Sequence, residues 1–248
     1  MKILLLDIET APNIVYTWGL FNQNISINQI DQPGYTLCWS SKWFDEDEVM
    51  FSSIHRGKKQ MLRKIHKLLD QADVVITYNG KKFDIPTLNK EFLIAGMLPP
   101  APYKHIDLYQ VVRSTFRFAS NKLDWICRQL EIGHKLEHKG HELWVGCMNG
   151  DPDDWEVMED YNRQDVVLLE DAYVIIRPWI YTHPNHSAED GIACCPKCGS
   201  ESLQARGYAF TTTMKYKRYQ CKACGGWARG TKTVLPRKEE RLTNVAAT

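Results

Sequence analysis

Near its start the chain reads Lys2-Ile3-Leu4-Leu5-Leu6-Asp7-Ile8-Glu9-Thr10, a short apolar run that leads into two acidic residues. The run is too short to cross a membrane and is typical of a buried strand. Successive side chains of a strand point to opposite faces, so we expect Asp7 and Glu9 on one face at its carboxyl end. Neighbouring carboxylates repel each other unless a cation lies between them, and oxygen ligands suit Mg²⁺ or Mn²⁺. The alternative is a surface strand end with two solvated acids.

The composition is that of a globular protein. The chain has 248 residues, of which 44% are hydrophobic and 25% charged, enough for one large domain or for an ordinary domain with a small appendage. No apolar stretch has membrane length, and Asp7 and Glu9 interrupt the apolar region that a signal peptide would need. We therefore expect a cytoplasmic protein without membrane contacts.

Charge is unevenly distributed along the chain. Residues 191–248 contain 11 Lys and Arg against 3 acidic residues, a net charge of +8, and the preceding residues carry −7. A basic appendage on an acidic body predicts an anionic polymer that one part holds and the other processes. The alternative is a solvated basic tail.

The order of expected elements predicts an α/β fold with a mixed sheet flanked by helices. Aromatic and branched residues, or short apolar runs, predict strands at 14–20, 35–44, 49–54, 74–78 and 104–108. Apolar residues at helical spacing predict helices at 58–71, from 84 to about 96, at 108–116, 121–130 and 153–176.

Two further acids lie where they could join the first pair. Asp84 stands where a strand passes into a helix, although Asp is also a favoured N-cap and Pro86 suits a first helical turn. Tyr161 and Asp165 are four residues apart and share a helix face, and the apolar run after them indicates burial. A buried Asp165 needs a partner, which a shared cation or a hydrogen-bond network could supply. Two metal ions about 4 Å apart on such acids can drive phosphodiester hydrolysis.

These motifs together resemble the DEDD superfamily of 3′–5′ exonucleases, in its tyrosine subclass, which has the ribonuclease H-like fold. Asp7-Ile8-Glu9 matches the first motif, Phe83-Asp84 the second, and Tyr161 to Asp165 the Tyr-x-x-x-Asp third motif. The resemblance covers about residues 1–180.

The resemblance implies roles for individual residues. Asp7, Glu9 and Asp165 would bind the metal that activates water, while Asp7, helped by Asp84, would reach a second Mg²⁺ or Mn²⁺ ion. Tyr161 would orient the attacking water. Three further residues would contact the terminal nucleotide: Thr10, Asn79 and Phe83.

The C-terminal part carries a separate cysteine pattern. Two Cys-x-x-Cys pairs, each followed by Gly, predict a tetrathiolate site for one structural Zn²⁺ ion, formed by Cys195, Cys198, Cys221 and Cys224. Cys194 is an extra thiol that could replace Cys195. The pattern resembles a zinc ribbon, with hairpin strands at about 208–213 and 215–219. Residues that could contact nucleic acid through cations and stacking rings are Lys215, Tyr216, Lys217, Arg218 and Tyr219; the alternative is a protein-contact module.

We therefore expect an exonuclease domain at residues 1–180, a zinc ribbon at 191–230 and a disordered tail at 231–248. The predicted activity is two-metal 3′–5′ exonucleolytic hydrolysis that releases nucleoside monophosphates, with single-stranded DNA favoured. The alternatives are a non-cutting nucleic-acid-binding protein, an endonuclease or RNA exonuclease on the same fold, and a zinc-ribbon adaptor. The expected partner is nucleic acid with a single-stranded 3′ end, and proofreading would need a polymerase, replication or repair partner.

Overall fold

The computed structural model describes residues 1–186, 193–235 and 242–243. The chain divides into two compact units. The first, from Lys2 to Tyr173, we call the body, and the second, which begins at Val174, contains a small sheet that we call the ribbon.

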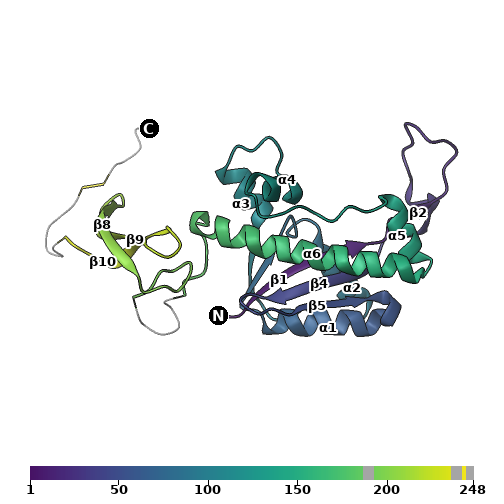
Figure 1. The fold of residues 1–248 in the computed structure, drawn as a ribbon, viewed down its shortest axis with the longest axis horizontal. Coiled ribbons are helices and arrows are strands. Elements are labelled where there is room, and N and C mark those ends of the chain that lie inside the picture. Colours follow the sequence, from purple (N-terminus) through teal and green to yellow (C-terminus); the bar gives the residue numbers. More distant parts are fainter. Residues whose placement is uncertain (187–192, 236–241, 244–248) are drawn as a thin grey trace. The chain divides into compact units, whose positions relative to one another are not determined.

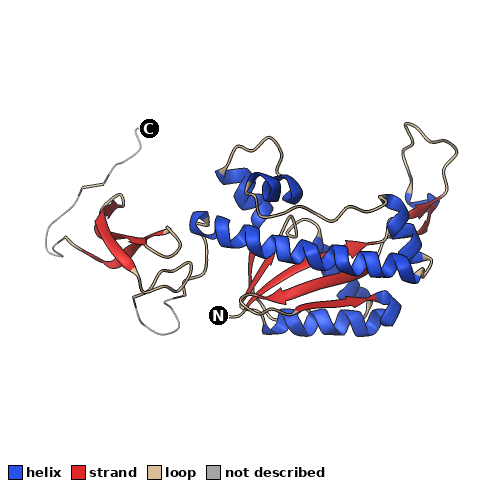
Figure 2. Ribbon diagram, viewed as in Figure 1, coloured by secondary structure: helices blue, strands red, loops and turns tan. Residues whose placement is uncertain are grey.

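The body is built on a five-stranded mixed sheet flanked by helices, as expected (Figures 1 and 2). Its strand order is β5-β4-β1-β6-β7. β1 pairs in antiparallel fashion with β4, which pairs in the same way with β5, whereas β1, β6 and β7 run parallel. The strands are β1 (Ile3–Thr10), β4 (Thr36–Trp43), β5 (Val49–Ser53), β6 (Val74–Thr77) and β7 (Lys104–Asp107).

Helices cover both faces of this sheet. α1 and α2 pack on one face, around a core that includes Met61, Ile65 and Phe92. The long helix α6 runs along the other face (Figure 1), and α5 shares its core cluster with α6. The body's helices are α1 (Lys58–Gln71), α2 (Asp84–Ile94), α3 (Leu108–Thr115), α4 (Leu123–Gln129), α5 (His141–Met148) and α6 (Pro152–Ile176). None of the described helices has the length and apolar character needed to cross a bilayer.

Strand alternation decides what each face of β1 carries. Leu4, Leu6 and Ile8 belong to the core cluster under α1 and α2. Asp7 and Glu9 therefore point to the opposite face, toward α6. The expected placement of both acids on one face is confirmed, and it aims them at the helix that carries Asp165.

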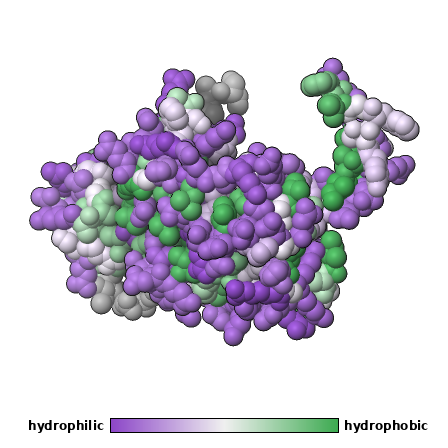
Figure 3. Space-filling view, turned by 45° about the vertical axis from the view of Figure 1, so that its right-hand side comes forward, coloured by the Kyte–Doolittle hydropathy of each residue, from purple (hydrophilic) through white to green (hydrophobic). Residues whose placement is uncertain are grey.

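The strand predicted at 14–20 is largely wrong. Only β2 (Ile14–Val15) is extended, and it pairs with β3 (Ile30–Gln32) at the base of a long loop. Residues 16–29, which we call the arm, stand clear of the body (Figure 3). Trp18 is fully exposed, and Leu20 is 91% exposed. These side chains have no sheet face to pack against, so their β propensity does not extend the strand.

The ribbon is a three-stranded antiparallel sheet of order β10-β9-β8, with β8 (Leu203–Phe210), β9 (Lys215–Cys221) and β10 (Trp227–Thr233). The first hairpin strand was expected at about 208–213, but β8 begins at Leu203 and already ends at Phe210. The tail predicted from residue 231 is wrong for its first three residues, since Thr233 pairs with Tyr216. Residues 236–241 and 244–248 of that tail lie outside the described part of the chain, as do residues 187–192.

Candidate metal centre and nucleic-acid site

Three acids from two elements meet at one point of the body. Asp7 and Glu9 come from the end of β1 and Asp165 from the middle of α6, and one carboxylate oxygen of each lies within 4.8 Å of the others. Asn162, one turn before Asp165 on α6, donates from Nδ2 to Asp7 Oδ2 at 2.7 Å. The long helix therefore supplies both an acid and a hydrogen-bond donor to the end of β1.

Asp84 reaches the same place from α2, which packs on the face of the sheet opposite to α6. It is the first residue of α2 and 3% exposed. The alternative that Asp84 caps this helix is wrong, because the N-cap position is Phe83 and no side chain caps the helix there. Instead, Asp84 Oδ1 accepts a hydrogen bond of 3.2 Å from the backbone N–H of Ile8, the residue between Asp7 and Glu9. A contact 76 positions apart in the chain thus holds the fourth acid beside the first pair.

Lys135 is the counter-charge of this cluster. It lies in the loop between α4 and α5, and its Nζ donates to Asp165 Oδ2 and, at 3.0 Å, to the Tyr161 hydroxyl. The backbone N–H of Lys135 donates to Asp124 Oδ1 at 2.9 Å, which fixes the loop against α4. One ammonium group therefore occupies part of the space among the carboxylates.

Tyr161 is held by rings as well as by Lys135. His138 packs edge-on against it at 4.8 Å between centroids, and Trp144 does so at 6.1 Å. The indole N–H of Trp144 donates to Glu9 Oε2 at 3.2 Å. The ring cluster connects Tyr161 on α6 to Glu9 on β1, so the phenol is positioned rigidly beside the acids.

Burial raises the pKa of every acid in the cluster, and repulsion by neighbouring acids of the cluster adds to the shift at Asp7 and Glu9. Burial raises the pKa of Glu9 to about 7, and the neighbouring Asp165 adds to this effect. Burial likewise raises the pKa of Asp84 to about 7. The pKa of Asp7 lies well above its ordinary value because of burial and then the charges of Asp165, Asp84 and Glu9. For Lys135, burial opposes the charge, but Asp165, Tyr161 and Asp7 raise its pKa above the ordinary value.

The donor set fits a divalent cation. Asp165 Oδ1 is buried and has no hydrogen-bond partner among the described residues. An unpaired buried carboxylate oxygen is costly, and a shared cation would satisfy it together with Asp7 and Glu9. Carboxylate oxygens are ligands of Mg²⁺ and Mn²⁺.

A cleft of about 450 Å³ opens beside Asp7, within the size range of small-ligand sites. Its other lining residues include Tyr78, Asn79, Tyr109, Leu123 and Lys135. Of the three residues expected near the terminal nucleotide, Asn79 lines this cleft, Thr10 ends β1 directly after Glu9, and Phe83 is 44% exposed and does not line it.

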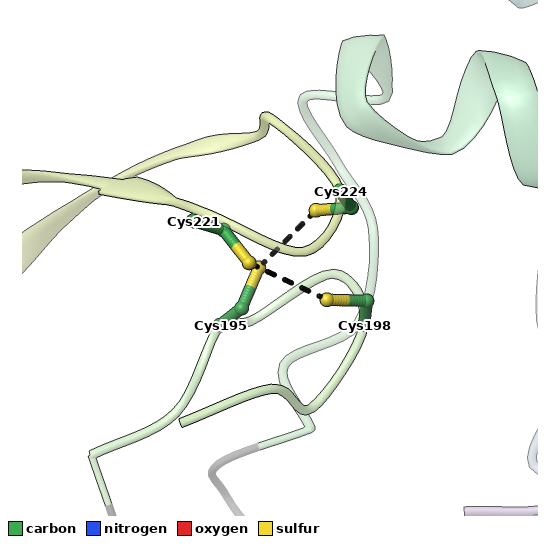
Figure 4. A group of neighbouring side chains, drawn as sticks. All are labelled: Cys195, Cys198, Cys221 and Cys224. Carbon is green, nitrogen blue, oxygen red and sulfur yellow. Dashed lines mark hydrogen bonds between the residues drawn. The ribbon is translucent and has the colours of Figure 1, made fainter. Parts of the chain in front are cut away.

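The ribbon brings its four predicted cysteines together (Figure 4). The four sulfur atoms all lie within 4.8 Å of one another. The Sγ atoms of Cys195 and Cys224 are 3.7 Å apart, and so are those of Cys198 and Cys221. Cys195 and Cys198 come from the loop before β8, and Cys221 and Cys224 from the end of β9 and the turn after it. This geometry is compatible with a tetrathiolate zinc site. Cys194 is not in the group.

Four residues around the acids were given no role in the site from the sequence. Asn162 lies inside the Tyr161–Asp165 motif, three residues before Asp165. Helical spacing alone therefore predicts that it lies on nearly the same face of the helix as Asp165. The other three come from a loop and a short helix that carry no periodic signal: Lys135, His138 and Trp144.

The comparisons with known proteins agree with this fold. The model of the RNase H superfamily matches residues 4–176, well over half of the chain. The chain therefore belongs to the RNase H superfamily. A DNA polymerase of Pyrococcus glycovorans is 24% identical over 200 residues, which cover 70% of this chain and 24% of that polymerase. The family B DNA polymerase of Pyrobaculum calidifontis has a similar fold, with a TM-score of 0.51 and 15% identity over 71% of this chain and 24% of that one.

Proposed function

We propose that this protein is a metal-dependent 3′–5′ exonuclease of the tyrosine DEDD type. The observation that carries the proposal is the meeting of Asp7, Glu9 and Asp165 within 4.8 Å, beside Asp84, with Tyr161 and Asp165 sharing the Lys135 ammonium. The chain spans about a quarter of the length of the polymerases that it resembles. Their similarity supports a nucleic-acid-processing domain, and the direction and metal dependence of cleavage are part of the proposal.

Each residue of the site would have its own role in hydrolysis. Asp7, Glu9 and Asp165 would hold one Mg²⁺ or Mn²⁺ ion, and Asp7 with Asp84 would hold a second. Such ions, when bound, supply an activated water and charge neutralisation at the scissile phosphate. The Tyr161 hydroxyl accepts from Lys135, and its own proton would orient the attacking water. Lys135 adds a positive charge where negative charge grows during hydrolysis.

The cleft beside Asp7 would take the terminal nucleotide. Tyr78 and Tyr109 offer ring surface there, with their centroids 6.0 Å apart. Thr10 and Asn79 would contact the sugar and base, and exposed Phe83 would meet the strand farther out. We propose the ribbon, with one Zn²⁺ ion, as a second contact for the same strand.

The test is a time course with single-stranded DNA and RNA of one sequence, labelled at either end, in Mg²⁺ or Mn²⁺. We expect a metal-dependent ladder that shortens from the 3′ end, and at least a thousandfold slower cleavage by Asp7→Asn. The matched control is Asp160→Asn, an exposed acid on α6 one residue before Tyr161, which should cleave at the wild-type rate.

Other outcomes would replace this proposal. Internal cuts would make the protein an endonuclease, and metal-dependent cleavage of RNA alone would make it an RNA exonuclease. Tight binding of both substrates without cleavage would indicate a binding scaffold. Absence of both binding and cleavage would leave the protein-contact role of the ribbon, and a polymerase, replication or repair protein would then be the partner to test.

A further inference from the structure

The ribbon carries far more positive charge than its own carboxylates can neutralise. Residues 193–235 contain eight Lys and Arg residues and one acidic residue, Glu201. Among the described residues, no arginine of this sheet forms an ion pair. A ligand that carries negative charge could therefore balance these cations.

Two of these arginines lie directly opposite each other. In the antiparallel pairing of β9 and β10, the Cα partner of Arg218 is Arg229, so both side chains leave the same face. Like charges at directly opposed positions destabilise an antiparallel pair. As with the carboxylates of the body, such a pair indicates a site for the opposite charge.

Aromatic rings hold the two guanidinium groups in place. The Arg229 guanidinium carbon lies 4.1 Å from the ring centroid of Tyr216, and that of Arg218 lies 4.9 Å from Trp227. Trp227 and Arg229 are two residues apart on β10, and Tyr216 and Arg218 are two apart on β9, so all four share one face. Trp227 is 45% exposed, which leaves ring surface available to a ligand.

A third arginine joins this face from β8. Arg206 donates from Nη1 to Gln220 Oε1 at 2.6 Å, and its carbonyl accepts from Arg218 Nε at 3.0 Å. Gln220 is the register partner of Trp227. We call the group Arg206, Tyr216, Arg218, Trp227 and Arg229 the arginine face.

The opposite face of β9 carries lysines instead of arginines. It carries Lys215, Lys217 and Tyr219, by alternation along the strand. The Lys215 ammonium lies over Tyr208 at 4.0 Å and over Phe210 at 5.6 Å, while Lys217 is paired in register with Tyr208. In the pairing of β9 with β8, Lys215 and Lys217 thus each lie opposite an aromatic residue.

We propose that the arginine face is the surface on which this protein holds single-stranded nucleic acid. Guanidinium groups match phosphate oxygens through paired N–H donors. A phosphate between Arg218 and Arg229 would relieve their repulsion, and bases would stack on Trp227 and Tyr216, as in single-strand binders that interleave cations with rings. The inference rests on the proposed function for the class of ligand. It assigns no direct role to Lys215, Lys217 or Tyr219.

The test compares two double variants of the full chain that remove equal charge from opposite faces. One is Arg218→Gln with Arg229→Gln, and the other is Lys215→Gln with Lys217→Gln. Binding of a fluorescent 20-nucleotide deoxythymidine strand is measured by anisotropy at several salt concentrations, without added divalent metal. A chelator is left out because it would remove zinc, and equal zinc content shows that both variants are folded.

We expect the arginine variant to bind at least tenfold more weakly, with a salt slope reduced by about 1.4 because two phosphate contacts of a single strand are lost. The lysine variant should lose less than threefold. Trp227→Ala alone should weaken binding severalfold with an unchanged salt slope.

Equal losses in the two double variants, or no loss in either, would overturn the inference. So would arginine-dependent binding to phosphatidylserine vesicles with unchanged binding of the strand, which would make the face a membrane contact. The readout is independent of cleavage. A chain that binds through the arginine face and never cuts would remove only the proposed function, and a cutting chain whose binding ignores Arg218 and Arg229 would remove only this inference.

Discussion

Lys135 shows how a single loop residue can control a cluster of acids. Four carboxylates lie together in the body, and the Lys135 ammonium contacts Asp165 and Tyr161 at their centre. Without bound metal, this lysine is the cation that limits repulsion among them. Its side chain is 31% exposed, so its charge is only partly screened by solvent.

Replacing this lysine should therefore weaken the metal-free protein. We expect Lys135→Met to lower stability by about 1–3 kcal/mol, less than for a fully buried pair, and the melting temperature by roughly 5 °C. Added Mg²⁺ should restore most of the loss, because it replaces the missing positive charge. The measurement is thermal unfolding with and without Mg²⁺.

The control is Lys59→Met, an exposed lysine of α1, which should melt within about 1 °C of wild type. A loss of equal size in both variants, or a loss that Mg²⁺ does not reverse, would contradict the counter-charge role of Lys135.

The acids could be found from sequence because regular structure fixes their directions. Alternation along β1 gives the common face of Asp7 and Glu9, and helical spacing gives that of Tyr161 and Asp165. Lys135 and Trp144 reach the same point through tertiary packing of a loop and a short helix. No local pattern records such a contact, so these residues could be recognised only in the structure.

At the scale of elements, periodicity predicts well where a face is buried. The helix expected at 58–71 is α1 with the same bounds, because its apolar residues face a packed sheet. The arm fails for the opposite reason. Its aromatic and branched residues have strand propensity, but they have no surface of the body to pack against. Propensity without burial does not form a strand.

This contrast predicts very different costs for the same substitution in two tryptophans. Trp18→Ala should leave the melting temperature within about 1 °C of wild type, because Trp18 is fully exposed on the arm. Trp39→Ala should cost about 3–5 kcal/mol, because that ring is 2% exposed and its N–H donates to the Met61 carbonyl at 3.1 Å. Thermal unfolding of both variants is the measurement. A comparable loss for Trp18→Ala would mean that the arm packs on the body in solution.

At the scale of the whole molecule, the two units carry clusters of opposite charge. The body brings acids together at the end of β1, and the ribbon brings arginines together across β9 and β10. A small three-stranded sheet also lacks a core large enough to fold unaided, and four thiolates around zinc would supply that stability. The division of charge was visible in the sequence, but the separation of the ribbon's cations onto two faces needed the strand register.

Global stability should depend on pH through the acid cluster. In the folded body the pKa values of Glu9 and Asp84 are raised to about 7, whereas they lie near 4 in an unfolded chain. Between these values the folded protein keeps protons that the unfolded chain has released. Stability is therefore highest at low pH as far as these groups are concerned, and it falls as pH rises through this window.

Without divalent metal, we expect the melting temperature of the body to fall by several degrees between pH 5 and pH 8. Mg²⁺ at millimolar concentration should reduce this fall, because a cation among the carboxylates stabilises their charged form. Glu9→Gln should also flatten the profile, since it removes one of the titrating groups, whereas Asp160→Asn, an exposed acid, should leave it unchanged. Calorimetry at four pH values with and without Mg²⁺ measures all three effects. A melting temperature that rises with pH in the metal-free protein would contradict the cost of burying these carboxylates in their charged form, and with it the physical reason for placing a metal there.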